Sequence, residues 1–205
     1  MKNIKKAEIA FVAILVIYLA ISGIRDFSSD YSHLQNNVVR IHILANSDSE
    51  EDQNLKLNVR DEILSYTNNW LSGCASAKQA REILGSKIDQ INQIAQEKVS
   101  ASGYSYTTQS GLVDMEFDDR TYGDITMPHG LYSAVRVTIG EAAGHNWWCV
   151  MYPPLCVPAA SGVLNIDDYD EYFTDGEMDI LKNCGKYKVK FRCVEMFNKL
   201  LSAIK

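Results

Sequence analysis

The apolar positions divide the chain into an N-terminal apolar run, a helix-rich stretch and a strand-rich stretch. Residues 38–44 are short, rich in branched apolar side chains and followed by a polar Asn-Ser-Asp segment, which predicts an interior strand. Apolar side chains then recur at helical spacing in two runs, first at Leu55, Val59, Ile63, Tyr66 and Trp70, then at Ala80, Leu84, Ile88, Ile91 and Ala95. Gly73 separates the runs, so we expect a helical hairpin.

Residues that favour helix ends frame both runs. Ser47 to Asp52 combines capping side chains with carboxylates, which satisfy free amide groups and suit the positive end of the helix dipole. Ser76 to Gln79 has the spacing of a capping box. Gly103 suits a left-handed stop. We therefore place the helix boundaries at these residues.

The second half of the chain alternates as strands do. Alternating segments occupy residues 104–108, 113–117, 131–139 and 146–152, with a loop at 120–130 and a turn at 140–144. Pro153 and Pro154 end the last strand. Residues 158–176 read as an acidic, exposed connection, and a last helix from Lys186 to Lys205 packs on the domain through Val189, Cys193, Met196, Phe197, Leu200, Leu201 and Ile204. The fold class is α+β, one domain with a mixed or antiparallel sheet, the helical hairpin and a C-terminal helix.

The N-terminus has the pattern of an export signal. Lys2, Lys5 and Lys6 precede an almost continuous apolar run over residues 9–24. As a helix this run reaches ~24 Å, short of a ~30 Å hydrocarbon core. That length favours a signal peptide over a lasting anchor, and both remain open. We assign residues 1–25 to the signal or anchor helix, 26–37 to a tether and 38–205 to the α+β domain.

Charge and composition exclude some partners. The chain has an ordinary globular composition, 46% apolar and 22% charged, and a net charge of -6. Residues 1–25 hold four basic side chains and one acidic one, so the remainder carries -9. An acidic body repels nucleic acid and anionic headgroups. We expect no nucleic-acid partner, and membrane contact only through the N-terminal segment.

The five cysteines allow disulfides if the chain is exported. Cys149 and Cys156 flank the two prolines, which could fold the chain back and bring these sulfur atoms together. We name this pair as a disulfide candidate. An odd number leaves at least one thiol free, and small buried apolar side chains are an equally good reading of all five.

No common catalytic or metal-binding motif occurs. The chain has no Gly-x-Ser-x-Gly, His-Glu-x-x-His or phosphate loop, and no Cys or His spacing typical of zinc. We therefore expect no cofactor and no metal. A cysteine nucleophile stays open, because Cys149 could meet His42, His129 or His145 in three dimensions. Chance placement of four histidines and five cysteines explains such triads equally well.

Trp147 and Trp148 form an unusual pair. Neighbouring strand residues point to opposite faces, so if one indole enters the core, the other faces a second layer, a groove or solvent. A covering helix or a binding partner would satisfy this second indole. On the first helix, Asp52, Lys56 and Arg60 form a stripe of alternating charge. A solvated face held by weak ion pairs is the simplest reading of that stripe.

Two segments carry a family resemblance. The first contains Val39-Arg40-Ile41-His42-Ile43-Leu44-Ala45-Asn46-Ser47-Asp48-Ser49, then Asp52-Gln53, Leu55-Lys56 and Val59-Arg60-Asp61. The second contains Pro128, Gly130, Tyr132, Ala134-Val135-Arg136-Val137, Ile139-Gly140-Glu141, Gly144, Asn146-Trp147-Trp148-Cys149-Val150 and Pro153-Pro154-Leu155-Cys156. Together they resemble the signatures of the stage II sporulation protein R family. Met127, His129 and Tyr152 depart from the common pattern, and the C-terminal third matches more loosely.

The resemblance implies a forespore protein exported into the space between the two sporulation membranes. A membrane-embedded aspartic protease of the mother cell would sense it and cut the precursor of the early mother-cell sigma factor. The protein itself would not be an enzyme. Our candidates for partner contact are Arg40, His42, Asn46, Asp52, Lys56, Arg60, Asn146, Trp147 and Trp148. The alternative is an exported cysteine-dependent hydrolase of peptide or cell wall, with Cys149 as nucleophile.

Overall fold

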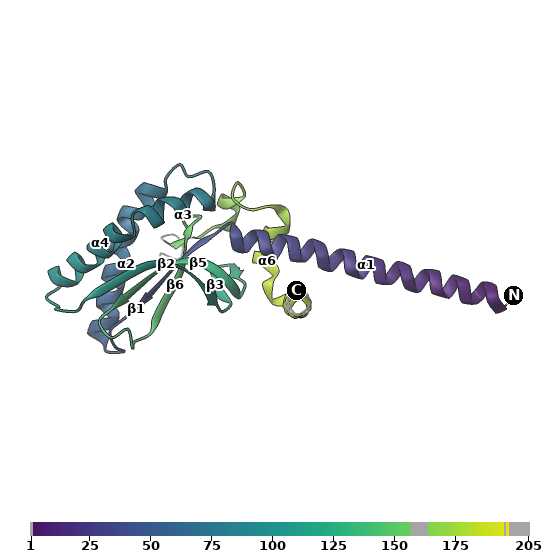
Figure 1. Ribbon diagram of the computed structural model, residues 1–205, viewed down its shortest axis with the longest axis horizontal. Coiled ribbons are helices and arrows are strands. Elements are labelled where there is room, and N and C mark those ends of the chain that lie inside the picture. The colour runs from purple at the N-terminus through teal and green to yellow at the C-terminus, as the bar shows by residue number, and fades with distance from the viewer. Residues whose placement is uncertain (1, 157–163, 195, 197–205) are drawn as a thin grey trace.

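A computed structural model describes residues 2–156, 164–194 and 196. A four-stranded sheet lies at its centre (Figure 1). One face of the sheet is covered by a layer of three helices, and the other by the end of the N-terminal helix, a small β-hairpin and the C-terminal helices. Two clusters of buried apolar side chains lie in these two interfaces. The fold is a single α+β domain with a mixed sheet, as the sequence predicted.

The elements follow the chain in this order. The first half contains α1 (Lys2–Asn36), β1 (Val39–Leu44), α2 (Glu50–Leu71), α3 (Ala77–Ser86) and α4 (Ile88–Ala101). The strands of the second half are β2 (Thr108–Phe117), β3 (Arg120–Tyr122), β4 (Ile125–Met127), β5 (Gly130–Ile139) and β6 (Asn146–Tyr152). They are followed by η1 (Ile166–Tyr169), α6 (Asp175–Asn183), η2 (Cys184–Tyr187) and a helical segment over residues 188–194.

Strand β1 is interior, which confirms the prediction from its apolar composition. The strand order is β2-β5-β1-β6, and β1 pairs parallel with β5 and antiparallel with β6. Side chains alternate across a strand. Val39, Ile41 and Ile43 therefore enter the core beneath α2, α3 and α4, and Arg40 and His42 point into the opposite layer.

The helical hairpin is present, but its second arm is broken. Ser49 caps α2 by accepting from the backbone N–H of Asp52, and Ser76 caps α3 through Gln79 in the same way. Gly73 and Gly103 have positive φ angles of 83° and 85°, as expected for helix stops. The predicted second helix is interrupted at Lys87, where the backbone leaves helical geometry. The break allows α4 to pack along both α2 and β2.

Two expectations for the second half were wrong. The strand predicted to begin at residue 104 begins at Thr108. The loop predicted over residues 120–130 contains the β3–β4 hairpin, a separate two-stranded sheet. Strands β5 and β6 and the turn between them agree with the sequence pattern.

The tether predicted over residues 26–37 is helical instead. These residues continue α1 to Asn36, and Phe27, Tyr31 and Leu34 are buried in the core beneath the sheet. Their spacing of four and three residues forms an apolar stripe that the polar serines and asparagines of this segment obscured. Side chains of the preceding apolar run lie partly outside the described residues. Within the described part of the chain, we find no helix with the length and apolar character needed to cross a membrane.

The C-terminal region differs in detail from the prediction. Part of the expected acidic connection, residues 158–163, lies outside the described residues, and further along it Ile166 and Phe173 are buried rather than exposed. The last helix is present over residues 188–194, and the predicted positions from 197 onward lie outside the described part. Its buried side chains are Phe191 and Val194. The predicted packing face was wrong, because Val189, Cys193 and Met196 are exposed.

Candidate functional site

A fully buried arginine lies at the centre of the candidate site. Arg40 leaves β1 on the face covered by the β3–β4 hairpin and has no exposed surface. Its guanidinium carbon lies 3.9 Å from the centre of the Phe117 ring and 5.0 Å from that of Tyr132. Its Nη2 atom donates to the hydroxyl of Tyr122 at 3.1 Å. Within the described residues, Nε and Nη1 have no acceptor.

This arrangement is energetically unusual. An arginine stays charged in proteins, and a buried charge is normally paired with a counter-charge. No ion pair to Arg40 occurs among the described residues. Attraction to two aromatic rings compensates part of the lost hydration. Buried polar groups without partners are rare and call for a structural or functional explanation.

His42 adds a stacked aromatic pair beside Arg40. Its imidazole lies parallel to the indole of Trp148, with ring centres 3.8 Å apart and an interplanar angle of 3°. Nε2 is 2.8 Å from the side-chain oxygen of Asn146, and Nδ1 has no partner in the described part of the chain. Burial lowers the pKa of His42, and the nearby charge of Arg136 acts in the same direction. The neutral imidazole then donates from Nε2 to Asn146.

Tyr122 holds the β3–β4 hairpin against Arg40 and Trp148 through hydrogen bonds. Its hydroxyl accepts from Arg40 and donates to the backbone oxygen of Trp148 at 3.0 Å. Burial raises the pKa of Tyr122 to about 12, so the hydroxyl keeps its proton. Trp148 also contacts Phe117 edge-on, at 4.8 Å between ring centres. One hydrogen-bonded tyrosine thus links the hairpin to both neighbouring strands of the sheet.

A second group of candidates forms a buried polar network at the start of α2. The Asp52 carboxylate accepts from the Asn46 amide at 2.8 Å and from the Ser47 hydroxyl at 2.6 Å. Burial acts to raise the pKa of Asp52, but these hydrogen bonds outweigh it and the pKa is lowered. The Asn46 side-chain oxygen accepts from the backbone N–H of Glu141 at 3.0 Å. This network joins the segment after β1, the start of α2 and the turn before β6.

Glycines allow the turn to approach this network. A Cβ atom on Gly140 would overlap the Asn46 side chain, and one on Gly144 would overlap the backbone oxygen of Ser47. Lys56 is buried as well, and its ammonium donates to the side-chain oxygen of Gln53 and to the backbone oxygen of His145 at 2.9 Å. Burial lowers the pKa of Lys56.

The two tryptophans lie on opposite faces of β6, as the alternation predicted. Trp147 packs against the core beneath α2, where the guanidinium carbon of Arg60 lies 4.9 Å from its ring. Trp148 packs into the layer beneath the hairpin. Arg60 also pairs with the exposed Asp61. Both indoles are therefore half-buried, and each packs against one of the two clusters.

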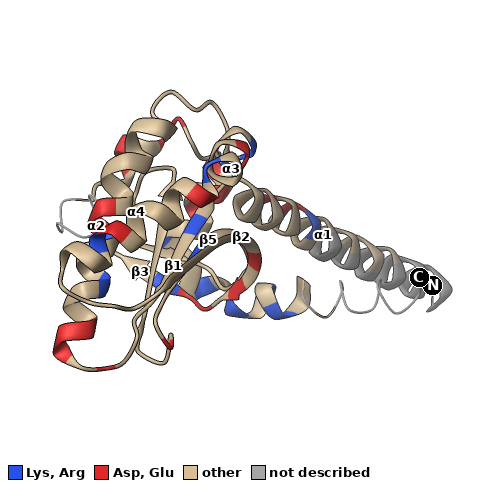
Figure 2. Cartoon of the chain, turned by 60° about the vertical axis from the view of Figure 1, so that its left-hand side comes forward, with Lys and Arg blue, Asp and Glu red and all other residues tan. Residues whose placement is uncertain are grey.

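The structure separates the nine predicted contact residues into two groups. Arg40, His42, Asn146 and Trp148 share the layer beneath the hairpin. Asn46, Asp52, Lys56, Arg60 and Trp147 gather around α2 and the sheet edge beside it. The stripe on α2 is not a solvated face, because Asp52 and Lys56 are buried. Figure 2 shows where charged residues lie along the elements.

The comparisons with known proteins bear on both groups. A family model described as stage II sporulation protein R matches residues 35–161. The chain belongs to the stage II sporulation protein R family. It is 36% identical over 123 residues to the stage II sporulation protein R of Bacillus subtilis (strain 168), which covers 60% of this chain and 55% of that relative. The match thus spans about half the length of the relative. No solved structure matches the chain.

The region matched to the stage II sporulation protein R family contains every candidate contact residue. It also contains aromatic residues of the site that the sequence interpretation did not single out for this role: Phe117, Tyr122 and Tyr132. The sequence did contain a signal that could have placed Tyr122 in a β-hairpin. Gly123 and Asp124 form a two-residue connection between short alternating segments, which is typical of a tight β-hairpin.

The cysteines do not form the predicted disulfide. Cys149 and Cys156 are both buried free thiols, and the Cys156 thiol donates to the backbone oxygen of Val150 at 2.9 Å. Burial raises the pKa of Cys156 well above its usual value, and a hydrogen bond with Cys149 adds to this effect. The prolines do bring the two side chains together, and a cis peptide bond joins Tyr152 to Pro153.

Cys149 is not placed beside His42. The two residues belong to neighbouring strands, but Ile41 is opposite Cys149 and Trp148 is opposite His42. Cys149 therefore points into the core beneath α2, while His42 stacks in the other layer. The sheet lies between the sulfur atom and the imidazole. This geometry does not provide a Cys149–His42 pair.

Proposed function

We propose that this protein is an exported sporulation signal that activates a membrane-embedded aspartic protease of the mother cell. The activated protease cuts the precursor of the early mother-cell sigma factor. Membership of the stage II sporulation protein R family supports this proposal. The basic and apolar N-terminal sequence supports export into the space between the two sporulation membranes.

The observation that carries the proposed mechanism is the unpaired guanidinium of Arg40. Its Nε and Nη1 groups have no acceptor among the described residues. A carboxylate or backbone oxygen supplied by a partner would satisfy them, and hydrogen bonds to a charged group are the stronger kind. Tyr122 fixes the β3–β4 hairpin above this group. In our proposal, binding displaces the hairpin and transfers Arg40 from Tyr122 to the partner.

The chemistry of the thiols favours binding over catalysis. Burial raises the pKa of Cys74, Cys156 and Cys184, the last to about 11. The thiolate is the reactive form of cysteine, so these shifts disfavour nucleophilic attack near neutral pH. Cys149 has no exposure that would admit a substrate, at 1% of its surface, and faces away from His42. We therefore propose a ligand that acts through its folded shape.

Reconstituted processing tests this function. Membranes that contain the protease and the sigma-factor precursor would be mixed with the full chain, and precursor cleavage would be followed over time. We expect cleavage to depend on the chain and to be lost with Arg40→Met. Arg136→Met is the matched control, because Arg136 projects from the next strand on the same sheet but is exposed. Normal activation by a folded Arg40→Met variant would refute the role of Arg40.

The alternative of a cysteine-dependent hydrolase is tested with the same assay. Cys149→Ala should activate the protease as well as the wild-type chain does, provided that circular dichroism shows an unchanged fold. Loss of activation by this variant alone, with selective labelling of Cys149 by a thiol probe at neutral pH, would favour chemistry over binding.

A further inference from the structure

The last described helix is basic in an otherwise acidic protein. Residues 186–205 hold six Lys or Arg residues and one Glu, whereas the whole chain has a net charge of -6. From η2 to residue 194 the cations are Lys186, Lys188, Lys190 and Arg192, and all four are exposed. Figure 2 shows basic residues along this helical segment. Surface charges act over about 8–10 Å at physiological salt, so a local cluster decides what this helix attracts.

This helix has two apolar stripes rather than one. Phe191 and Val194 are buried against the domain. Val189 and Met196 project outward and are 75% and 65% exposed. Cys193 is also exposed and lies between them at helical spacing. The outward stripe is not needed for packing within the described domain.

Cations flank the outward stripe on both sides. With a turn of 100° per residue, Lys188 and Arg192 fall on one side of Val189 and Cys193, and Lys190 falls on the other. A narrow apolar stripe between basic side chains is the pattern of a helix that lies in the interface of an anionic membrane. Long basic side chains there extend to the headgroups while the apolar stripe enters the acyl boundary.

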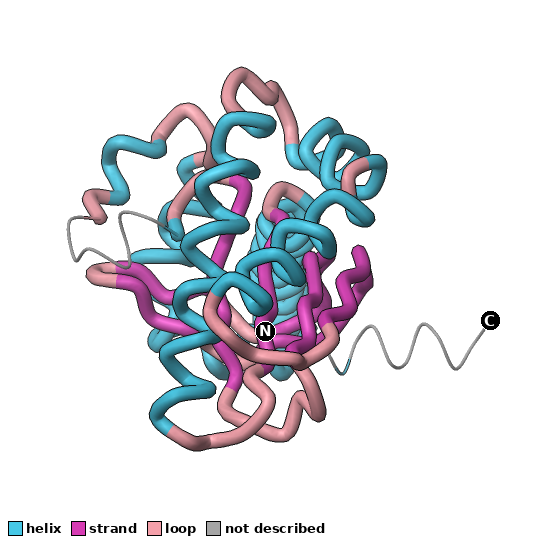
Figure 3. The backbone as a smooth tube through the Cα atoms, turned by 90° about the vertical axis from the view of Figure 1, so that its left-hand side faces the viewer, coloured by secondary structure: helices cyan, strands magenta, loops and turns pink. Residues whose placement is uncertain are grey.

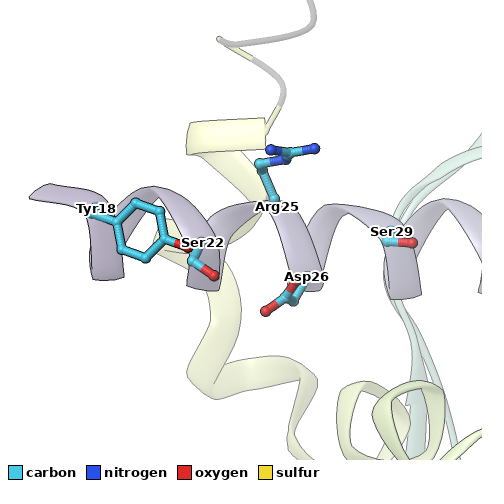
Figure 4. A pocket seen from close by; sticks show the side chains of 5 residues that line it. All are labelled: Tyr18, Ser22, Arg25, Asp26 and Ser29. Carbon is cyan, nitrogen blue, oxygen red and sulfur yellow. The ribbon is translucent and has the colours of Figure 1, made fainter.

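Aromatic contacts hold this helix against α1. The ring of Phe191 is 5.0 Å from that of Phe27 and 4.9 Å from that of Tyr31, both on α1. Lys190 lies 5.2 Å from the Phe27 ring. Figure 4 shows the final helix beside Arg25 of α1, where Tyr18, Ser22, Arg25, Asp26 and Ser29 line a hollow of about 320 Å³. The final helix and α1 therefore pack side by side in this part of the molecule.

The direction of the two helices suits a membrane surface. In Figure 1, α1 projects away from the domain and the final helix crosses it steeply, and Figure 3 shows the same domain along α1. The projecting part of α1 carries further exposed apolar side chains: Phe11, Ile14, Leu15, Tyr18 and Leu19. When this end of α1 enters a bilayer, a helix that crosses it steeply lies along the bilayer surface.

We propose that residues 188–194 and Met196 form a second membrane contact, which docks on anionic lipid headgroups through Val189, Cys193 and Met196 and the surrounding cations. It adds to the N-terminal contact predicted from the sequence and sets the orientation of the domain on the membrane. The cationic cluster favours an anionic membrane over a symmetric dimer through this helix, because such a dimer would bring two like-charged clusters together. The inference does not depend on the identity of the protease.

Fluorescence quenching at Cys193 tests this contact in the full chain. A Cys74→Ser background leaves Cys193 as the exposed thiol of the described part, since the other three are buried. An environment-sensitive dye would be attached to Cys193, and the chain would be added to vesicles that carry headgroup-level nitroxide lipids. We expect quenching several-fold stronger in vesicles with 30% phosphatidylglycerol than in pure phosphatidylcholine, and a loss of that difference at 0.5 M NaCl.

Charge reversal separates this contact from insertion of α1. Each cation near an anionic surface contributes roughly fivefold to membrane affinity. Lys188→Glu/Arg192→Glu should therefore reduce quenching in anionic vesicles to the neutral-vesicle level, while Lys78→Glu, an exposed cation on α3, leaves it unchanged. Equal quenching in both lipids, or none, would overturn the proposal. A dye already shielded without lipid, together with a dimer in light scattering, would overturn it in favour of a protein interface.

Discussion

Replacement of the buried Arg40 should stabilise the protein while it abolishes activation. Arg40→Met loses one charged hydrogen bond, at about 1.5–3 kcal/mol, and two aromatic contacts of the guanidinium, at about 1–2 kcal/mol each. It also removes the several kcal/mol that a buried ion costs and two nitrogen atoms without acceptors, at about 1–3 kcal/mol each. The destabilising terms that Arg40→Met removes are larger than the stabilising contacts that it loses. We expect a net gain of about 1–3 kcal/mol.

The geometry around Tyr122 supports this balance. Its hydroxyl keeps the hydrogen bond to the backbone oxygen of Trp148 when Arg40 is absent, so no new unsatisfied group is created. A methionine side chain follows the apolar stem of arginine and packs well between Phe117 and Tyr132. A residue whose removal stabilises the fold is retained for another reason, and functional sites commonly carry such a cost.

Urea denaturation followed by tryptophan fluorescence measures the effect. The midpoint should rise without a change in slope, and the melting temperature should rise by roughly 2–4 °C per kcal/mol. Arg136→Met should change the free energy of unfolding by less than about 0.5 kcal/mol, because Arg136 is exposed. A loss of more than about 2 kcal/mol in Arg40→Met, with activation retained, would show that the guanidinium serves the fold and would refute the reasoning.

Three further predictions address other parts of the structure. Gly144→Ala should lower the free energy of unfolding by more than about 2 kcal/mol, because its Cβ would overlap the backbone of Ser47. Gly73→Ala, at an open position, should lower it by only about 1 kcal/mol, and equal losses in urea denaturation would contradict the packing. Burial lowers the pKa of His42, so the unfolded state binds a proton at a higher pH than the folded state does. The free energy of unfolding should therefore fall as the pH drops below about 6.5, by up to about 1.4 kcal/mol per pH unit, and His42→Phe should flatten this slope in parallel titrations. With a colorimetric thiol reagent at pH 8, the exposed Cys193 should react first and the buried Cys156 only after unfolding. Mass spectrometry that finds the reverse order would contradict these exposures.

Much of the fold could be predicted because local rules agreed with the tertiary arrangement. The branched run of β1, the capped helix starts at Ser49 and Ser76, and the stops at Gly73 and Gly103 each depend on a few neighbouring residues. Alternation in β6 alone placed Trp147 and Trp148 on opposite faces. The family signatures fell within the region that the family model matches.

The site could be predicted only as a set of residue types. Sequence pointed to Arg40, Asp52 and Lys56 but not to their burial, because a polar side chain becomes buried only when distant segments cover it. Tyr122 covers Arg40 across 82 positions, and the backbone oxygen of His145 accepts from Lys56 across 89.

Patterns near the chain ends failed for a related reason. Phe27, Tyr31 and Leu34 are separated by serines, Asp30 and His33, so their stripe is hard to recognise in the sequence. Phe191 packs against Phe27 and Tyr31 only in the folded protein. The final helix has two apolar stripes, and spacing cannot say which one faces the core. The sequence by itself determined most of the elements of the domain and the family, since these follow from local spacing and motif. Only the tertiary structure decided which charges are buried and which apolar face remains outside, because burial depends on contacts between segments far apart in the chain.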